Sequence, residues 1–330
     1  MSVEPQKVLV TRNRIDNAAV EMLKAKNLVC VFSPPDRSVE EIAELAKREK
    51  VCAIMVSQGK ITRDVVAASD QLQVIAKHGS GVNNINLSAA EEMGIPVYRA
   101  VGANARAVAE HAIALMLALR KSLPRLDAAT KQGDWLKGSF VGHDIEGTRL
   151  GLLGLGVIGR EVARLAKALG MEVAAYDPAL SASQDTGLKI YSDPHDMARN
   201  VDIVSLHCPL IPATRHIVDS EFLRCMGSEA VLVNTARGGV VDETALSHAL
   251  SEGIIAGAGI DSFETEPPDS DAPLFGAPNL IVTPHAAGLT PGAERSMATM
   301  AADFIINHLE GKEIPTEFCA HAANLGGLSE

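Results

Sequence analysis

Short apolar runs of strand length alternate with amphipathic segments of helix length along almost the whole chain. In the first third, the strand-like runs lie at 7–10, 28–32, 53–56 and 74–76, and the helix-like segments lie at 16–25, 38–49 and 63–68. Ser38 is followed three residues later by Glu41, which predicts a capping box, and Thr62 is expected to cap the helix that begins at residue 63. Such alternation is typical of parallel α/β sheets. The first third therefore predicts a small doubly wound domain.

A second series of strand-like runs begins near residue 150. These runs lie at 150–153, 172–176, 204–206, 231–233, 257–260 and 280–283. A long helix is expected at 107–121, with an apolar side broad enough to pack against a partner surface. An amphipathic helix is expected at 290–309, where Pro291 suits the first turn because its missing N–H costs nothing there. The fold class predicted is α/β, with two doubly wound parallel-sheet domains.

A glycine-rich turn joins the strand-like run at 150–153 to a helix-like segment at 160–169. Gly154 permits a tight turn, Gly156 lets backbone N–H groups approach a pyrophosphate, and Gly159 lets the helix pack close to the strand. Asp177 ends the next strand-like run, where a carboxylate can accept hydrogen bonds from adenosine ribose hydroxyls and would repel a 2′-phosphate. This arrangement predicts a dinucleotide site that prefers NAD to NADP.

Composition and charge narrow the choice of partners. Hydrophobic residues make up 47% of the 330 positions, and a chain of this length is expected to form roughly two domains. The net charge of -11 and the isoelectric point near 5.4 argue against a polyanion-binding surface, and no dense cluster of Lys and Arg with interleaved aromatic residues is found. We therefore expect a small-molecule substrate and no nucleic acid.

The sequence also bears on location and metal content. The segment at 1–7 has no apolar core of a signal peptide, and the most apolar stretch, 107–119, is interrupted by Glu110 and His111. Five cysteines stand at scattered spacings without a CxxC pair, which indicates reduced thiols rather than a zinc site or a disulfide framework. We expect a cytoplasmic protein with no membrane partner and no metal.

Three polar residues follow successive strand-like runs, where ligands of open α/β sheets gather. They are Arg237, Glu266 and His285. A histidine beside a carboxylate can deliver a proton to a carbonyl oxygen, and a guanidinium can bind a carboxylate through two hydrogen bonds. Taken singly, each has an ordinary structural interpretation: His285 as a packed turn residue, Arg237 as a helix-end or phosphate-contacting residue, and Glu266 as a solvated charge. Together, behind a nucleotide-binding turn, they predict reduction of a 2-oxo acid.

Several motifs give the chain a resemblance to a known family. They are Gly79-Ser80-Gly81-Val82-Asn83-Asn84-Ile85, Val108-Ala109-Glu110-His111, the turn at 154–159, Ser205-Leu206-His207-Cys208-Pro209-Leu210, the segment 234–242, Gly259-Ile260-Asp261, Glu266-Pro267 and Pro284-His285. From Val8 to Gly311 the chain resembles the NAD-dependent D-2-hydroxyacid dehydrogenases, which include phosphoglycerate dehydrogenase, hydroxypyruvate/glyoxylate reductase and formate dehydrogenase.

The resemblance implies a discontinuous domain organisation. The substrate-binding domain would comprise residues 1–103 and 288–330 and be flavodoxin-like, and an NAD-binding Rossmann domain would occupy residues 104–287. Asn104 and Ala287 would lie near hinges, whose closure would expel water. A homodimer is expected through the coenzyme domain, with the helix from Ala107 contributing. Trp135, the only tryptophan, is expected to pack at a domain edge.

The resemblance also implies roles for individual residues. His285 would be the acid/base, Glu266 its orienting partner and Arg237 the group that binds the substrate carboxylate and carbonyl. The backbone of Ser80, Gly81 and Val82 would hold the substrate carboxylate, because consecutive N–H groups in a glycine-flanked turn can form an anion-binding nest. The residues expected to contact the cofactor are Gly154, Gly156, Val157, Ile158, Gly159, Asp177, His207, Pro209, Thr214, Thr235, Ala236, Asp261 and His285.

The resemblance implies more specific roles for two of these residues. Asp261 would accept a hydrogen bond from the nicotinamide carboxamide. His207 would line the cofactor cleft, with the alternative that it is only a buried, hydrogen-bonded strand residue.

Departures from the family pattern narrow the substrate. Phosphoglycerate dehydrogenases tend to have an arginine for the phosphate just after the third strand, whereas here only Lys60 offers charge in the segment 55–60. Formate dehydrogenase is disfavoured because its acid/base partner is a glutamine, whereas this chain has Glu266. We expect an NAD-dependent reductase of hydroxypyruvate, glyoxylate or a similar acid. The alternatives are a D-3-phosphoglycerate dehydrogenase lacking a regulatory domain, and an NAD(H)-sensing, corepressor-like binding protein.

Overall fold

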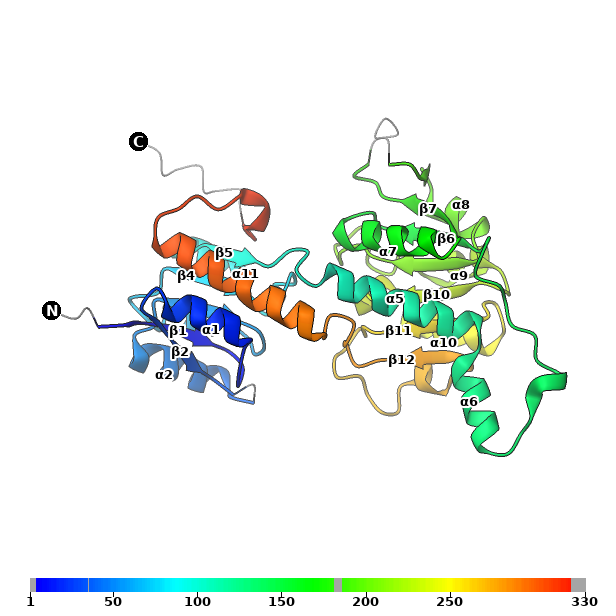
Figure 1. Ribbon diagram of the computed structural model, residues 1–330, viewed down its shortest axis with the longest axis horizontal. Helices are drawn as coiled ribbons and strands as arrows, with labels where there is room; N and C mark the ends of the chain where they lie inside the picture. Colours follow the sequence, from blue (N-terminus) through cyan, green and yellow to red (C-terminus); the bar gives the residue numbers. More distant parts are fainter. Residues whose placement is uncertain (1–3, 35, 181–185, 322–330) are drawn as a thin grey trace. The chain divides into compact units, whose positions relative to one another are not determined.

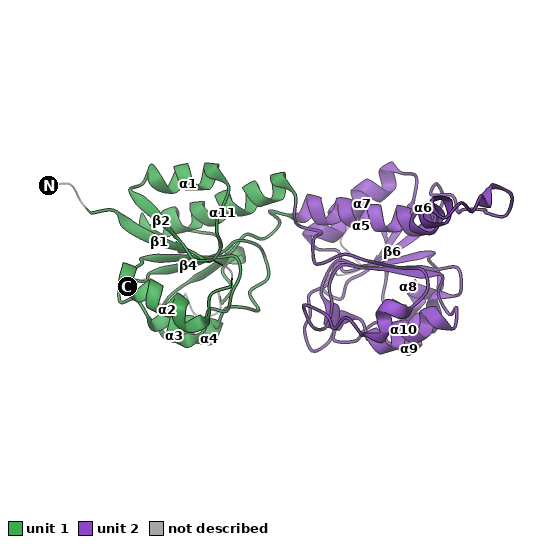
Figure 2. Ribbon diagram, turned by 90° about the horizontal axis from the view of Figure 1, so that it is seen from below, with its two compact units in different colours: residues 1–104, 290–330 green, residues 105–289 purple. Residues whose placement is uncertain are grey.

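The computed structural model of the chain describes residues 4–34, 36–180 and 186–321. The chain divides into two compact units (Figure 2). Unit 1 comprises residues 1–104 and 290–330, and unit 2 comprises residues 105–289. Unit 2 is therefore inserted, in sequence, between the two segments that build unit 1. The binding of substrate by unit 1 and of coenzyme by unit 2 stays a prediction.

Unit 1 is built on a parallel sheet in the order β2-β1-β3-β4-β5. Its strands are β1 (Gln6–Val10), β2 (Leu28–Phe32), β3 (Ala53–Val56), β4 (Val74–Lys77) and β5 (Val97–Arg99). One face is covered by α1 (Asn17–Lys24) and α11 (Pro291–Leu309), and the other by α2 (Val39–Glu49), α3 (Arg63–Ala67) and α4 (Leu87–Glu92) (Figure 2). This is the flavodoxin-like order, as predicted.

Burial on both faces explains the near-continuous apolar runs of the central strands. Every residue of β3 is buried, with Ala53 and Met55 in the core beneath α11 and Ile54 and Val56 in the core beneath α2 and α3. The predicted capping box of α2 is present. Thr62 is the N-cap residue of α3, as predicted, and its backbone is extended, but its buried hydroxyl donates to and accepts from no group of the first turn.

Unit 2 is built on a parallel sheet in the order β12-β11-β10-β9-β6-β7-β8. Its strands are β6 (Arg149–Leu153), β7 (Glu172–Tyr176), β8 (Lys189–Tyr191), β9 (Ile203–Leu206), β10 (Val231–Asn234), β11 (Gly257–Ile260) and β12 (Leu280–Val282). Helices α5 (Ala105–Arg120) and α7 (Val157–Ala168) cover one face, and α8 (Pro194–Arg199), α9 (Ser220–Met226) and α10 (Glu243–Ser251) cover the other (Figure 2). The strand order is that of a Rossmann fold with one added strand, as predicted.

The apolar side of α5 is used inside unit 2. It packs against α7 and against strands β10 and β11, so closely that a Cβ at Gly259 would lie 3.1 Å from Leu115. Beyond α5, helix α6 (Leu123–Lys131) and the 3-10 turn η1 (Leu136–Gly138) extend away from the sheet of unit 2 (Figure 1). No residue of α6 or η1 is buried. The expectation that Trp135 packs at a domain edge is wrong, because this extension leaves its side chain 77% exposed.

The described part of the chain contains no helix with the length and apolarity needed to span a bilayer. Within the same residues, no group of three or more His, Cys, Asp or Glu side chains is placed to hold a metal ion.

The glycine turn connects β6 to α7 at the point where the strand order reverses between β6 and β9. Gly154 has φ +101°, and a Cβ there would lie 2.8 Å from the backbone of His207 and Cys208. A Cβ at Gly159 would lie 2.3 Å from the carbonyl oxygen of Gly154, whereas a Cβ at Gly156 would meet nothing within 4 Å. The first and third glycines therefore serve the turn and the packing, and the second faces open space.

We predict that Gly159→Ala destabilises the protein more than Gly156→Ala. The added methyl at 159 must displace backbone, and overpacking of this kind costs about 1–3 kcal/mol, whereas at 156 the methyl has room. Urea denaturation of both variants measures the free energies of unfolding. Equal losses of stability in the two variants would contradict the packing role of Gly159.

Candidate active site

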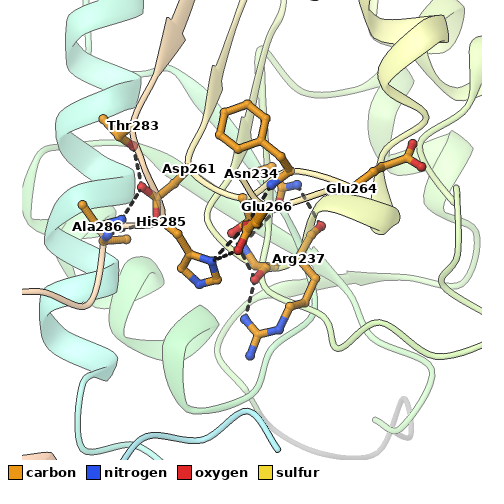
Figure 3. Close-up of polar contacts among 12 residues, drawn as sticks. Asn234, Arg237, Asp261, Glu264, Glu266, Thr283, His285 and Ala286 are labelled. Carbon is orange, nitrogen blue, oxygen red and sulfur yellow. Dashed lines mark hydrogen bonds and ion pairs between the residues drawn. The ribbon is translucent and has the colours of Figure 1, made fainter. Parts of the chain in front are cut away.

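The three predicted catalytic residues converge at one edge of the unit 2 sheet (Figure 3). Arg237 follows β10, Glu266 follows β11 and His285 follows β12, and these strands are parallel neighbours. Because the carboxyl ends of parallel strands meet at the same edge, the loops that follow them share one location. The sheet topology thus brings together side chains separated by up to about fifty positions in sequence.

The imidazole of His285 is bonded to the carboxylate of Glu266. His285 Nδ1 lies 2.8 Å from Oε2 and 3.0 Å from Oε1, and Oε1 also accepts from the backbone N–H of Phe263 at 3.0 Å. Since a carboxylate accepts hydrogen bonds, Nδ1 carries the hydrogen, and Nε2 is left for another partner. The His285 side chain is 46% exposed. This is the arrangement that a general acid/base requires.

The segment that carries His285 is held from beneath by Asp261. His285 has φ +53°, a left-handed conformation uncommon for a residue other than glycine. Its backbone N–H donates to the carbonyl oxygen of Asp261 at 2.8 Å. The Asp261 carboxylate accepts from the N–H groups of Ala286 and Ala287, at 2.8 and 3.0 Å, and from the hydroxyl of Thr283 at 2.5 Å (Figure 3). These contacts tie the loop to the end of β11.

These contacts bear on the role predicted for Asp261 as acceptor from a nicotinamide carboxamide. The residue is fully buried, and its observed partners belong to the loop that carries His285. The carboxamide contact therefore remains a prediction, beside an observed role in holding backbone.

Arg237 lies in the loop after β10, which packs closely against the loop after β11. A Cβ at the adjacent Gly238 would lie 1.8 Å from the carbonyl carbon of Phe263, so only glycine allows the loops to pass. The guanidinium donates through Nη1 to the carbonyl oxygen of Ala236 at 2.6 Å. Burial lowers the pKa of Arg237 below its usual value, while the negative charge of Glu266 acts in the opposite direction. Arginine stays cationic in proteins, so the site holds a fixed positive charge.

The β6–α7 turn offers the surroundings expected of a phosphate site. Gly156 is the N-cap residue of α7 and provides no side-chain cap, which leaves the first-turn N–H groups to a ligand. Val157, in that first turn, is 55% exposed, and Ile158 beside it is half-buried. Asp177 accepts from the N–H of Leu155 at 2.8 Å through Oδ2 and from that of Ala179 at 2.9 Å through Oδ1. Each of these oxygens keeps a lone pair for a hydroxyl donor.

Two further predicted cofactor residues carry buried polar atoms without a protein partner in the described part of the chain. These atoms are Nδ1 of His207 and Oγ1 of Thr235. His207 Nε2 lies 2.9 Å from Ser205 Oγ, and burial lowers the pKa of His207 to about 3, so the imidazole is neutral. An unmade hydrogen bond at a buried atom costs about 1–3 kcal/mol, which a polar ligand would recover. His207 is thus a buried, hydrogen-bonded residue, and its contact with a cofactor stays a prediction. The residues present fit a dinucleotide.

The remaining cofactor candidates shape the ends of β9 and β10. Thr214 donates to the carbonyl oxygen of Pro209 at 2.6 Å and accepts from the N–H of Ile211 at 2.9 Å, so its hydroxyl serves the turn. The N–H of Ala236 donates to Asn234 Oδ1 at 3.0 Å. These bonds hold the loop conformations, and contact of either loop with a cofactor stays a prediction.

The predicted carboxylate-binding backbone lies in unit 1, in the loop after β4. Ser80, Gly81 and Val82 are half-buried. In the part of the chain that the structure describes, none of their N–H groups donates to a protein acceptor. Three consecutive N–H groups without partners are suited to an anion.

Two cations of unit 1 are already engaged by protein acceptors. Lys77 donates through Nζ to the carbonyl oxygen of Ser57 at 2.9 Å and to Asn84 Oδ1 at 3.0 Å. Arg12, which follows β1, forms an ion pair of 2.6 Å with Glu294 in the first turn of α11. Both charges are therefore balanced or bonded by the protein itself.

Sequence reasoning missed the positioning contacts of Thr283 and Asn84. Thr283 holds the buried Asp261, and Asn84 holds the buried Lys77. A polar residue directly after β12, two positions before His285, was a usable signal for the first. The second had none, because Asn84 lies in a turn where asparagine is common.

Comparisons with known proteins give consistent matches. The model of the family described as "D-isomer specific 2-hydroxyacid dehydrogenase, NAD binding domain" matches residues 113–287. D-3-phosphoglycerate dehydrogenase of Methanocaldococcus jannaschii is 38% identical over 308 residues, covering 93% of this chain and 58% of that protein. Hydroxypyruvate reductase of Thermotoga maritima is 36% identical, covering 89% of this chain and 96% of that protein. The chain thus spans little more than half the length of the first of these relatives.

Solved structures are similar as well. The TT0316 protein of Thermus thermophilus superimposes with a TM-score of 0.85 at 32% identity, over 94% of this chain and 99% of that one. A glyoxylate reductase from Paecilomyes thermophila superimposes with a TM-score of 0.83 at 30% identity, over 97% of this chain and 99% of that one.

We predict that His207 makes the stability of the ligand-free protein depend on pH. Its pKa is about 3 in the native state against an ordinary value of 6.5, so between these values the unfolded chain binds a proton that the native state does not. The free energy of unfolding therefore has its full value above pH 6.5 and falls as the pH is lowered toward 3. His207→Gln should lose less stability than the wild type between about pH 7 and about pH 5, measured by urea denaturation.

The control is His248→Gln, which changes an exposed histidine on α10 and should follow the wild type. An unchanged pH slope in His207→Gln would show that the residue is not the one that titrates.

Proposed function

Because the chain belongs to the family of D-isomer-specific 2-hydroxyacid dehydrogenases, we propose that it transfers hydride between NADH and a small 2-oxo acid, producing the D-2-hydroxy acid. The observation that carries the proposal is the His285–Glu266 pair, which leaves Nε2 of an exposed imidazole at the sheet edge that also holds Arg237. Relatives and neighbours named hydroxypyruvate reductase and glyoxylate reductase support the substrate class.

The residues of this chain supply the proton and the binding groups. When bound, the nicotinamide supplies the hydride. His285 donates a proton from Nε2 to the carbonyl oxygen, while Glu266 at Nδ1 orients the ring and stabilises its positive charge. The Arg237 guanidinium binds the substrate carboxylate and polarises the adjacent carbonyl. The N–H groups of residues 80–82 offer a further carboxylate-binding element in unit 1.

A coenzyme without a 2′-phosphate is supported by the end of β7. Asp177 stands there with both oxygens fixed by backbone donors, so its negative charge is held in place. A fixed carboxylate accepts from ribose hydroxyls and repels a phosphate at the same position. We therefore propose NADH as the preferred reductant.

A substrate without a phosphate group is supported by the cations of unit 1. Lys77 and Arg12 are engaged by protein acceptors, and Lys60 is exposed. A bound phosphate would have to compete with Glu294 for Arg12, or with Ser57 and Asn84 for Lys77. We propose hydroxypyruvate or glyoxylate as the substrate, rather than the phosphorylated acid that the name of the Methanocaldococcus relative indicates.

A panel of substrates tests the proposal directly. We expect the purified protein to oxidise NADH in the presence of hydroxypyruvate or glyoxylate. With the same substrates, it should oxidise NADPH more slowly. In the reverse direction, it should oxidise D-glycerate faster than 3-phosphoglycerate. Faster oxidation of 3-phosphoglycerate than of D-glycerate would instead identify the phosphorylated acid as the substrate. Coenzyme binding without turnover of any 2-oxo acid would instead favour a coenzyme-sensing binding protein.

We predict that His285→Ala lowers turnover about 10²- to 10⁴-fold, because the proton donor is lost. The affinity for NADH, measured by fluorescence titration, should stay nearly unchanged. His248→Ala, which removes an exposed imidazole elsewhere in unit 2, serves as the control and should retain wild-type turnover. Near-normal turnover in His285→Ala would refute the assignment.

The extension after α5 supports a homodimer. Leu123, Trp135 and Val141 are 53%, 77% and 90% exposed, which is unusual for large apolar side chains gathered in one segment. At the base of the extension, a cavity of about 470 Å³ is lined by polar side chains, which include Arg120, His143 and Glu229, together with apolar ones, which include Leu136, Phe140 and Leu280. We propose that a second copy of this chain covers these side chains.

We predict that the double variant Trp135→Lys, Val141→Lys has a monomeric mass by light scattering while the wild type has a dimeric one. Charges placed in an apolar interface would lose hydration without gaining partners. Val29→Lys adds a charge at another exposed apolar position, in unit 1, and should remain dimeric. A monomeric wild type would overturn the proposal.

We propose a cytoplasmic location because the cysteines are unpaired thiols. All five, Cys30, Cys52, Cys208, Cys225 and Cys319, carry free thiols. Free thiols without any disulfide are typical of reducing compartments.

A further inference from the structure

The proposed chemistry leaves His111 of α5 without a role, although its imidazole is bonded to the segment that carries His285. His111 Nε2 lies 3.0 Å from Thr283 Oγ1 and 3.8 Å from Asp261 Oδ1. The His111 side chain is 26% exposed, and Asp261 beyond it is fully buried. A polar helix residue thus reaches inward to the end of β12.

The direction of each hydrogen bond in this chain of contacts follows from the chemistry of its members. The hydroxyl of Thr283 has one hydrogen, which it donates to Asp261 Oδ1 at 2.5 Å. Its oxygen can then only accept from His111, so Nε2 of His111 must carry a hydrogen. His111 therefore donates to Thr283, and Thr283 donates to Asp261, whose carboxylate is the final acceptor.

Asp261 also contacts the backbone around His285. Its carboxylate accepts from the N–H groups of Ala286 and Ala287, and its carbonyl accepts from that of His285. Because His285 adopts a left-handed conformation, this backbone needs neighbours that hold it in place. The same backbone sets the direction in which the imidazole leaves the chain toward Glu266.

We propose that His111 is a positioning residue: by donating to Thr283 it fixes the Asp261 carboxylate, which holds residues 285–287 and thereby the His285 imidazole. The consequence for turnover rests on the proposed function, whereas the consequence for the backbone does not. His111 makes no contact with His285 itself and acts only through the two intermediate side chains.

Matched substitutions separate the hydrogen bond from the shape of the side chain. His111→Leu removes the donor, whereas His111→Gln places an amide nitrogen where Nε2 stood. Thr283→Val removes the hydroxyl at constant shape, whereas Thr283→Ser keeps it. Glu110→Gln is the control, because Glu110 is the adjacent residue on α5, is 51% exposed and forms its ion pair with Arg106, away from Thr283. Thermal unfolding establishes that each variant is folded before it is compared.

The first measurement is hydrogen–deuterium exchange at residues 286 and 287 in the coenzyme-free protein. Loss of a donor to Asp261 should raise the local opening of this backbone, so we expect about fivefold to tenfold faster exchange in His111→Leu and Thr283→Val. His111→Gln, Thr283→Ser and Glu110→Gln should exchange as the wild type does. This measurement needs no substrate.

The second measurement is steady-state kinetics with NADH and its 4-deuterated form. We expect kcat to fall about tenfold in His111→Leu and Thr283→Val, with KM and NADH affinity changed less than about twofold, because orientation of a proton donor acts on the chemical step. The primary isotope effect on kcat should rise in the same variants. The Gln and Ser variants should recover most of kcat.

Wild-type exchange at 286 and 287 in His111→Leu would overturn the proposal, whatever its turnover. A loss of kcat in His111→Leu without recovery in His111→Gln would also overturn it, since the donor would not be the cause. If the wild type reduces no 2-oxo acid, the proposed function fails, and the exchange experiment still decides on the positioning role by itself.

Discussion

The parallel direction of β10, β11 and β12 is the constraint on which the site depends. Each strand ends at the same edge, so the loops that follow must share a small volume. That crowding explains why Gly238 must be glycine, since the loop after β10 passes against the backbone of the loop after β11. It also explains how Arg237, Glu266 and His285 come together although no local motif places them side by side.

Burial gives the polar groups at this edge their chemical character. Asp261 is surrounded by donors and therefore holds backbone, while Glu266 is partly exposed and faces an imidazole. His207 is kept neutral by burial, so Nδ1 or Nε2 can act as donor or acceptor without bringing a charge to a cofactor. Arg237 keeps a positive charge in a desolvated setting, where attraction for an anion is stronger than in water.

The unmade hydrogen bonds of both units are consistent with ligand binding. His207 Nδ1 and Thr235 Oγ1 lack partners in unit 2, and the N–H groups of residues 80–82 lack partners in unit 1, as far as the described residues go. Folding leaves such groups unsatisfied at a cost, which a ligand with matching polar atoms recovers. Polar groups that do serve the fold, such as Thr214 and Asn84, have their bonds made within the loops.

Sequence alone determined what depends on local pattern. The strands at 28–32 and 53–56, the capping box at Ser38 and the turn from Gly154 to Gly159 could be predicted because side-chain periodicity and backbone permissiveness are properties of neighbouring residues. Helix α6 and strand β8 escaped prediction because α6 buries no residue and β8 is a three-residue edge strand, so neither leaves a periodic apolar signal.

Tertiary structure decided what depends on which groups meet across the fold. The sequence wrongly predicted that Trp135 is covered, and it could not show that the Thr62 hydroxyl makes no capping hydrogen bond. It also could not show which donors surround Asp261 or what His111 contacts. Each of these turns on a rotamer and on an element distant in sequence. A hydrogen bond forms or fails over less than an ångström, and only the packed chain sets distances that finely.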